Sequence, residues 1–251
     1  MNNNYTFEIC IDSVQSAINA QTAGAHRVEL CDNLFEGGTT PSAGMIQQVK
    51  KMAPGVKLFI IIRPRGGDFV YSEAEVSVML NDIVMAKNLG ADGIVSGCLK
   101  TNGDIDIENT RKLIQASGDL PFTFHRAFDM CRNHSEALEQ LIDLGTARIL
   151  TSGMEQTAHL GINTLKEIIK QANNRITILV GSGVKPENIA EIAQKTGAKE
   201  FHFSARKEFA SPMKFKNQNI NMSGVSGIPE FSRFYSDVDT IKSTINAVME
   251  I

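Results

Sequence analysis

The chain has 251 residues, of which 42% are hydrophobic and 21% charged, so it can form one large α/β domain or two small ones with an ample core. Its net charge of −3 indicates neither nucleic acid nor an anionic membrane as a partner. No apolar stretch approaches a membrane span, and residues 1–5 lack the basic and apolar regions of a signal peptide. We therefore expect a cytoplasmic protein.

Strand patterns and helix patterns alternate along the chain. Strands are expected at residues 6–12, 27–32, 57–62, 92–99, 121–129 (where the strand runs into polar residues), 148–152, 176–180 and 200–204. Helices are expected between them, at residues 13–23, 41–52, 72–89, 106–116, 135–144, 161–172 and 186–195. A long loop over residues 207–235 and a closing amphipathic helix at about 237–250 complete the chain.

A short internal repeat supports this count of elements. Each copy ends a helix with a glycine, which suits the left-handed position after a helix, and leads into a strand. The copies are Ala23-Gly24-Ala25, Leu89-Gly90-Ala91, Leu144-Gly145-Thr146 and Thr196-Gly197-Ala198. Four such βαβα units predict a (β/α)8 TIM barrel with residues 1–251 in a single domain. The alternative, an open doubly wound sheet, usually carries a glycine fingerprint after its first strand, and residues 10–14 have none.

In such barrels the functional residues lie at the carboxyl ends of the strands. Inward, polar side chains at these ends give five candidates for catalysis, which are Glu8, Glu29, Arg63, His125 and Asp129. Burying two glutamates without compensation would cost several kcal/mol, and Arg63 and His125 are the expected counter-charges. The alternative is that these groups form a satisfied layer of salt bridges inside the barrel, with no chemistry.

Two further groups of residues point to ligands. Gly181, Ser182 and Gly183 form a glycine turn before the seventh helix, where free N–H groups and the helix dipole favour an anion, and Ser204 would close the same pocket. The turn could equally be a plain connection. Cys10 and Cys31 lie on neighbouring strands and both should point inward, where two thiolates can bind Cu(I). Alternatively, each cysteine is simply a small buried hydrophobe.

Several of these stretches together resemble the CutC family, often called copper homeostasis proteins. They cover most of the chain and include Glu8-Ile9-Cys10-Ile11-Asp12-Ser13, Arg27-Val28-Glu29-Leu30-Cys31, Arg63-Pro64-Arg65-Gly66-Gly67-Asp68-Phe69 and Phe124-His125-Arg126-Ala127-Phe128-Asp129. The resemblance implies a cytoplasmic barrel with a role in copper handling. It also implies a Cu(I) site at Cys10 and Cys31.

Three functions remain open from the sequence. The first is copper binding by the two thiols. The second is an enzyme acting on a small anionic or phosphorylated substrate. In that enzyme the glycine turn holds the anion, Arg63 neutralises charge, His125 moves a proton, and Glu8 or Glu29 is the partner acid or base. The third is a non-catalytic scaffold whose loop at residues 207–235 joins two copies into a homodimer.

Overall fold

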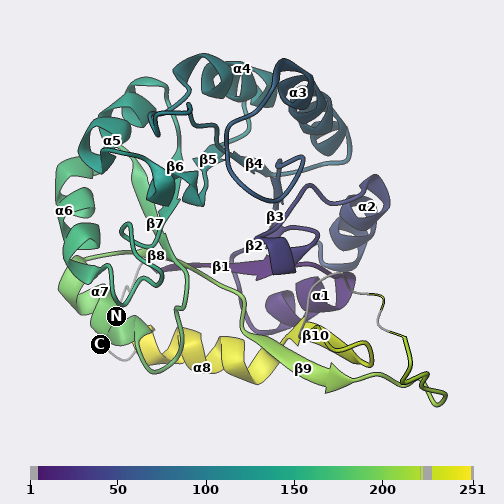
Figure 1. The fold of residues 1–251 in the computed structure, drawn as a ribbon. Coiled ribbons are helices and arrows are strands. Elements are labelled where there is room, and N and C mark those ends of the chain that lie inside the picture. The colour runs from purple at the N-terminus through teal and green to yellow at the C-terminus, as the bar shows by residue number, and fades with distance from the viewer. Residues whose placement is uncertain (1–4, 221, 223–227, 250–251) are drawn as a thin grey trace.

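The computed structural model describes residues 5–220, 222 and 228–249. Eight parallel strands close into a barrel in sequence order, and the helices form a ring around it (Figure 1). The strands of the barrel are β1 (Thr6–Ile11), β2 (Arg27–Leu30), β3 (Lys57–Ile61), β4 (Gly93–Ser96), β5 (Phe122–Phe124), β6 (Arg148–Thr151), β7 (Thr177–Gly181) and β8 (Glu200–Phe203). The predicted TIM barrel is thereby confirmed.

The helices follow the strands as the periodicity predicts, with ends that differ by a few residues. They are α1 (Val14–Thr22), α2 (Ala43–Met52), α3 (Glu73–Asn88), α4 (Ile107–Ser117), α5 (His134–Asp143), α6 (Ile162–Ala172), α7 (Ile189–Thr196) and α8 (Val238–Met249). Ser72 and Glu75 form a capping box at the start of α3. The repeated glycines adopt positive φ directly after their helices, for example 87° at Gly24 and 78° at Gly197.

The alternation of residues along β1 shows how the barrel divides its side chains. Phe7, Ile9 and Ile11 are at most 1% exposed and belong to the apolar core between the barrel and its helices. Glu8 and Cys10, at the alternate positions, face the inside of the barrel. The pairing of β1 with β2 places Cys10 beside Glu29, and the pairing of β1 with β8, which closes the barrel, places Glu8 beside His202. The polar residues of three strands therefore meet on one side of the barrel.

The segment after β8 is more ordered than the expected loop. β9 (Arg206–Ala210) and β10 (Ser232–Ser236) pair as an antiparallel ribbon that extends away from the barrel beside α1 and α8 (Figure 1). Ser236 ties the ribbon to α1, because its N–H donates to Ser16 and its carbonyl accepts from Asn19. Part of the predicted loop, residues 221 and 223–227, lies outside the described residues.

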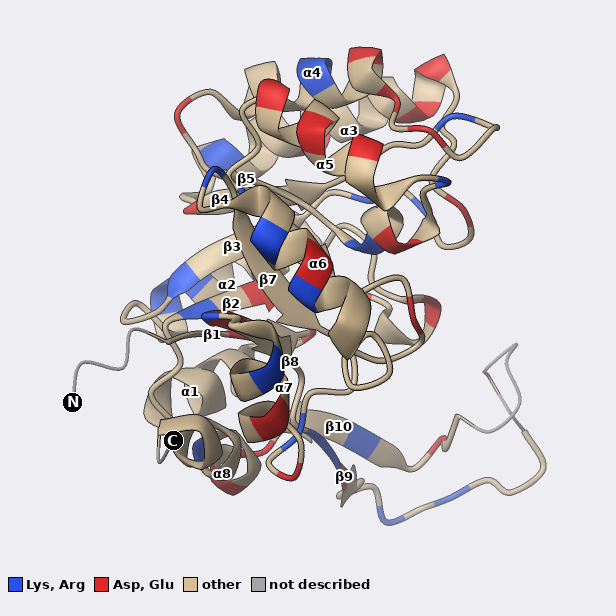
Figure 2. Cartoon of the chain, turned by 90° about the vertical axis from the view of Figure 1, so that its left-hand side faces the viewer, with Lys and Arg blue, Asp and Glu red and all other residues tan. Residues whose placement is uncertain are grey.

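The outer surface carries both signs of charge. Figure 2 shows Lys and Arg interspersed with Asp and Glu on the helices that face the viewer, including α6 and α7. Within residues 5–220, 222 and 228–249, no helix is both long enough and apolar enough to cross a membrane.

Candidate functional site

Five side chains from three neighbouring strands converge at the carboxyl end of the barrel. Sγ of Cys10 lies 3.8 Å from Sγ of Cys31, which in turn lies 3.5 Å from Oε2 of Glu29. On the other side, Nδ1 of His202 lies 2.7 Å from Oε1 of Glu8, and its Nε2 lies 3.7 Å from Oε2 of Glu29. We call these five residues the β8–β1–β2 cluster. It unites two of the predicted catalytic residues with both predicted copper ligands.

The charge of Glu8 is balanced by two partners. Nε of Arg27 donates to one carboxylate oxygen, and His202 contacts the other. Burial raises the pKa of Glu8, but these two cations outweigh it and lower the pKa to about 2. Arg27 also pairs with Glu200 at 2.7 Å. The prediction that Arg63 and His125 are the counter-charges is wrong, because Arg27 and His202 have that role.

Glu29 has the opposite environment. Glu29 is 3% exposed, and its Oε1 has no hydrogen-bond partner anywhere in the described part of the chain. Burial raises its pKa to about 8, against the attraction of His202. At neutral pH Glu29 therefore holds its proton, while Glu8 is ionised.

The two thiols are also distinct. The hydrogen bond from Cys31, with help from His202 and against burial, lowers the pKa of Cys10 to about 5. The same hydrogen bond, together with burial, raises the pKa of Cys31 well above its usual value. Although burial alone would lower the pKa of His202, the neighbouring Glu29, Cys10 and Glu8 raise it well above 6.5. At neutral pH the cluster thus holds a Cys10 thiolate beside a His202 imidazolium.

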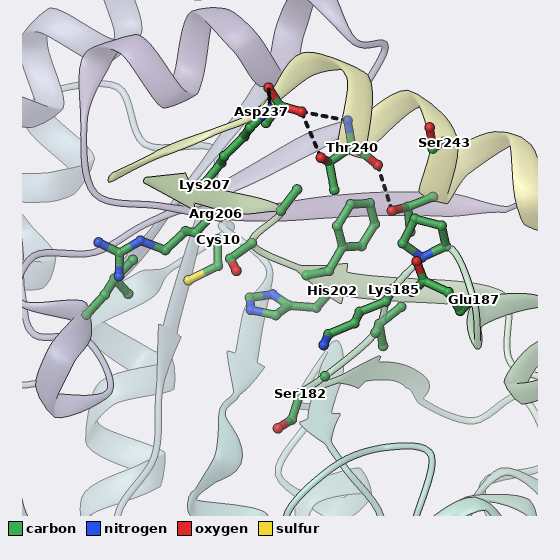
Figure 3. A pocket seen from close by; sticks show the side chains of 18 of the residues that line it. Cys10, Ser182, Lys185, Glu187, His202, Arg206, Lys207, Asp237, Thr240 and Ser243 are labelled. Atoms are coloured by element: carbon green, nitrogen blue, oxygen red, sulfur yellow. Dashed lines mark hydrogen bonds and ion pairs between the residues drawn. The ribbon is translucent and has the colours of Figure 1, made fainter. Parts of the chain in front are cut away.

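A cavity of about 1000 Å³ opens onto this cluster. Cys10 and His202 lie on its wall, and Figure 3 shows both side chains in the pocket with residues from the loops after β7 and β8 around them. Four lysine and arginine residues also line it, which are Arg126, Lys185, Arg206 and Lys207. Arg206 is paired with Asp12 at 2.9 Å, and Lys207 lies 3.8 Å from Asp237. The cavity is large enough for a small organic molecule.

Arg63 and His125 lie together at a different part of the barrel end. The Arg63 guanidinium donates to the carbonyls of Glu36, Gly38 and Gly67, which joins the loops after β2 and β3. The ring of Phe69 packs between Arg63 and His125, with its centroid 5.1 Å from Cζ of Arg63 and 4.9 Å from the imidazole centroid. Burial, together with the charge of Arg63, lowers the pKa of His125 to about 3. Neither residue lines the cavity.

Asp129 holds the loop after β6. It accepts hydrogen bonds from the Thr151 hydroxyl, from the backbone and hydroxyl of Ser152, and from the backbone of Met154. Arg126 pairs with the same carboxylate at 2.7 Å and reaches the cavity wall. Asp129 is therefore paired with Arg126 and with the loop after β6, and it has no contact with the β8–β1–β2 cluster among its hydrogen bonds and ion pairs within the described residues.

The predicted anion-binding residues divide into two kinds. Ser182, Gly183 and Ser204 line the cavity, as expected for a ligand site at this position. Gly181 instead ends β7, where an added Cβ would lie 2.6 Å from Leu150 and 3.3 Å from His202. Its lack of a side chain makes room chiefly for Leu150 and also for His202. The turn also does not enter α7 directly, because that helix begins at Ile189.

Comparison with known proteins places the chain in a family. The family model described as the CutC family matches residues 5–207. The chain belongs to the CutC family. A family protein CutC of Bacteroides fragilis is 54% identical over 98% of both chains, and a copper homeostasis protein cutC homolog of Homo sapiens is 46% identical over 98% of this chain and 89% of its own.

Solved structures agree with this placement. The crystal structure of CutC from Streptococcus agalactiae has 39% identity and a TM-score of 0.77, covering 80% of this chain and 98% of its own. Phosphoribosyl anthranilate isomerase from Thermotoga maritima has a TM-score of 0.59 at 15% identity, covering 98% of this chain and all of its own, and so shares the fold alone. The CutC family and the barrel are therefore both established for this chain.

Two important members of the site had no role in the sequence interpretation. Arg27 shares the inward face of β2 with Glu29 and Cys31, so the period of two along the strand already pointed to it. His202 was recognisable as inward on β8, but its approach to Glu8 depends on closure of the barrel. That closure brings residues 194 positions apart into contact.

Proposed function

We propose that this CutC family member binds Cu(I) through the thiolates of Cys10 and Cys31 and serves in copper handling. The single observation that carries the proposal is the 3.8 Å separation of the two sulfurs, with Cys10 on the wall of an open cavity. The mouse and human relatives, each 46% identical, are named copper homeostasis protein cutC homologs. We place this role in the cytoplasm, because all four cysteines are free thiols, as a reducing compartment favours.

The donor chemistry fits the ion. Soft thiolate ligands select Cu(I) over harder cations, and they must be deprotonated to bind it. Cys10 has a pKa of about 5 and is already a thiolate at neutral pH. Cys31 keeps its proton and would release it on binding, since its pKa lies well above the usual value. A copper ion arriving through the cavity meets Cys10 first and the buried Cys31 next.

The test is an anaerobic Cu(I) titration in competition with a strong chelator. Wild type should bind one ion tightly, and the double variant Cys10→Ser/Cys31→Ser should lose that binding. Cys131→Ser is the matched control, because this buried thiol is not part of the cluster. Weak binding by wild type, or equal binding by the double variant, would contradict the proposal.

A second candidate function is an enzyme acting on a small anionic or phosphorylated substrate. The observation that favours it is the cavity of about 1000 Å³, far more space than a bare ion needs, with Lys185 on its wall. Ser182, Gly183 and Ser204 would hold the anion, with Gly181 shaping the turn. Glu29 would transfer a proton near the Cys10 thiolate, and Glu8 would orient His202. Arg63, His125 and Asp129 would support this site through the loops they hold.

Phosphate binding tests this second function. Inorganic phosphate should raise the melting temperature of wild type beyond the effect of sodium chloride at equal ionic strength. Ser204→Asp should remove that increment, because it places a negative charge on the cavity wall. Gly183 is a poor position for the test, since its φ is 68° and a Cβ would lie 3.0 Å from Thr157. Equal shifts with both salts would count against an anion site.

A further inference from the structure

Four lysine and arginine side chains line the cavity, and one of them has no counter-charge. Arg126, Arg206 and Lys207 each lie 3.8 Å or less from an aspartate carboxylate. Lys185 has no ion-pair partner within residues 5–220, 222 and 228–249. Figure 3 shows its side chain pointing into the pocket, on the side of Ser182. An unpaired cation in a cavity attracts an anionic ligand.

We propose that Arg126 and Lys185 bind one phosphate group at the glycine turn, and that the ligand of this cavity is a phosphate monoester. The inference rests on the second candidate function, and it adds two binding residues and the class of the anion. Its experiment therefore includes Ser204→Asp, which tests the anion site without these two residues.

The loop after β6 places Arg126 beside the glycine turn. Nη2 of Arg126 donates to the carbonyl of Glu155 at 3.3 Å. The Ser182 hydroxyl donates to the carbonyl of the next residue, Gln156, at 2.7 Å. Lys185 follows Ser182 closely in the loop after β7 and lines the cavity with it. The two cations therefore approach the same turn, one from the loop after β5 and the other from the loop after β7.

The guanidinium of Arg126 is held in place and keeps one nitrogen free. Nε donates to Asp129 at 2.7 Å, and Nη2 donates to the Ser152 hydroxyl at 2.9 Å as well as to Glu155. Nη1 has no hydrogen-bond partner in the described part of the chain, although Arg126 lines the cavity. A donor that is fixed before the ligand arrives costs little conformational entropy on binding.

The glycine turn contributes its backbone rather than its hydroxyl group. Because the Ser182 hydroxyl donates to Gln156, it does not donate to a ligand. Ser182 and Gly183 have φ values of 74° and 68°, and turns with such left-handed residues can direct successive N–H groups at an anion. The charged donors of Arg126 and Lys185 would add to these N–H groups.

The donors favour phosphate over carboxylate. A carboxylate is planar and is bound best by two nitrogens of an arginine fork, but Arg126 has only Nη1 left. A phosphate group has three acceptor oxygens, which donors from different directions can share, and lysine binds phosphate as a point charge. The rest of the ligand would extend toward Cys10 and His202, which line the same cavity.

The experiment measures the affinity for inorganic phosphate from the rise of the melting temperature with phosphate concentration at constant ionic strength. Lys185→Gln and Arg126→Gln should each weaken phosphate binding about tenfold or more, because each loses a charge-assisted hydrogen bond. Lys185→Gln is the decisive variant, since this exposed, unpaired side chain is not needed for folding. Lys207→Gln is the matched control, because it removes the same charge from the same cavity wall and should change the affinity less than about twofold.

The outcomes separate this inference from the anion site on which it rests. Phosphate binding that falls in Ser204→Asp, Lys185→Gln and Arg126→Gln but is kept in Lys207→Gln supports the phosphate site. If Ser204→Asp loses binding while Lys185→Gln or Arg126→Gln keeps it, the anion site stands and the inference is overturned. Equal losses in Lys185→Gln and Lys207→Gln, or acetate binding as tight as phosphate binding, would overturn it as well. A wild type that does not bind phosphate would contradict the second candidate function together with the inference.

Discussion

The carboxyl end of the barrel has two polar regions that differ in their access to the cavity. In the β8–β1–β2 cluster, Cys10 and His202 border the cavity, and the buried Oε1 of Glu29 has no partner within the described residues. In the second region, which we call the Arg63–Phe69–His125 stack, the terminal nitrogens of the arginine donate to backbone carbonyls and the imidazole lies against an aromatic ring. Nε of Arg63 and Nε2 of His125 also lack partners within the described residues, but neither residue lines the cavity. The first region is therefore open to a ligand, and the second is enclosed by the protein.

The difference shows that the most distinctive sequence motif does not mark the most reactive site. Arg63-Pro64-Arg65-Gly66-Gly67-Asp68-Phe69 attracts attention because it is rich in charge and glycine. Its first arginine nevertheless holds two loops in place, as shown by its bonds to Glu36, Gly38 and Gly67. The stack thereby supports the loops at the barrel opening, whereas the cluster has the groups for binding or proton transfer.

The largest effect we predict comes from breaking this loop support. Arg63→Met should lower the free energy of unfolding by about 3 kcal/mol, because three carbonyls lose a charged donor. Urea unfolding measures the loss. Cu(I) binding per folded molecule should be unchanged, since Arg63 does not touch the cluster.

Arg132→Met is the matched control for Arg63. The side chain of Arg132 is 62% exposed and pairs with Asp104 at the surface. Such exposed ion pairs contribute about 1 kcal/mol or less. Equal losses in both variants, or a loss of copper binding in folded Arg63→Met, would show that the two polar regions are not separate.

Much of the fold was predictable from local patterns. The repeated glycines after α1, α3, α5 and α7 and the alternation of strands such as β1 fixed the number and order of the elements. The period of two also put Glu8, Cys10, Glu29 and Cys31 inside the barrel. These features depend on neighbours in sequence, so one chain is sufficient to read them.

The pairing of charges was not predictable in the same way. Arg63 and His125 were assigned to the two glutamates because they share the same end of the barrel. The actual partners, Arg27 and His202, are chosen by strand register and by closure of β8 onto β1. The ribbon of β9 and β10 was missed for a related reason, since its pairing joins segments more than twenty residues apart.

The next prediction uses the two buried histidines, whose pKa values move in opposite directions. His125 has a folded pKa of about 3, below its unfolded value of 6.5. The stability it contributes is present above pH 6.5 and is lost as pH falls toward 3. His202 has a raised pKa, so its contribution is fully present below pH 6.5 and is lost as pH rises through the folded value.

Two variants separate the pH-dependent contributions of His125 and His202 to stability. His125→Asn keeps an acceptor for the Ala127 N–H and removes the titration. Relative to this variant, wild type should lose about 2 kcal/mol of unfolding free energy between neutral pH and pH 5. Relative to His202→Gln, wild type should instead lose unfolding free energy as pH rises. Urea unfolding over a range of pH provides the measurement, and parallel curves for wild type and His125→Asn would contradict a buried neutral His125.

The smallest effect concerns the reactivity of a single thiol. Cys10 has a pKa of about 5 and borders the cavity, whereas burial raises the pKa of Cys98 to about 12 and that of Cys131 to about 11. Because the thiolate is the nucleophile, iodoacetamide should modify Cys10 first, at a rate that is nearly constant above about pH 6. Mass spectrometry of the labelled peptides follows each cysteine separately.

In His202→Gln the rate of Cys10 modification should keep rising above neutral pH. The imidazolium that helps to lower the pKa of Cys10 is absent from this variant. A rate for wild-type Cys10 that still rises tenfold between pH 7 and 8 would show an ordinary thiol, and the two polar regions would then differ only in their access to the cavity.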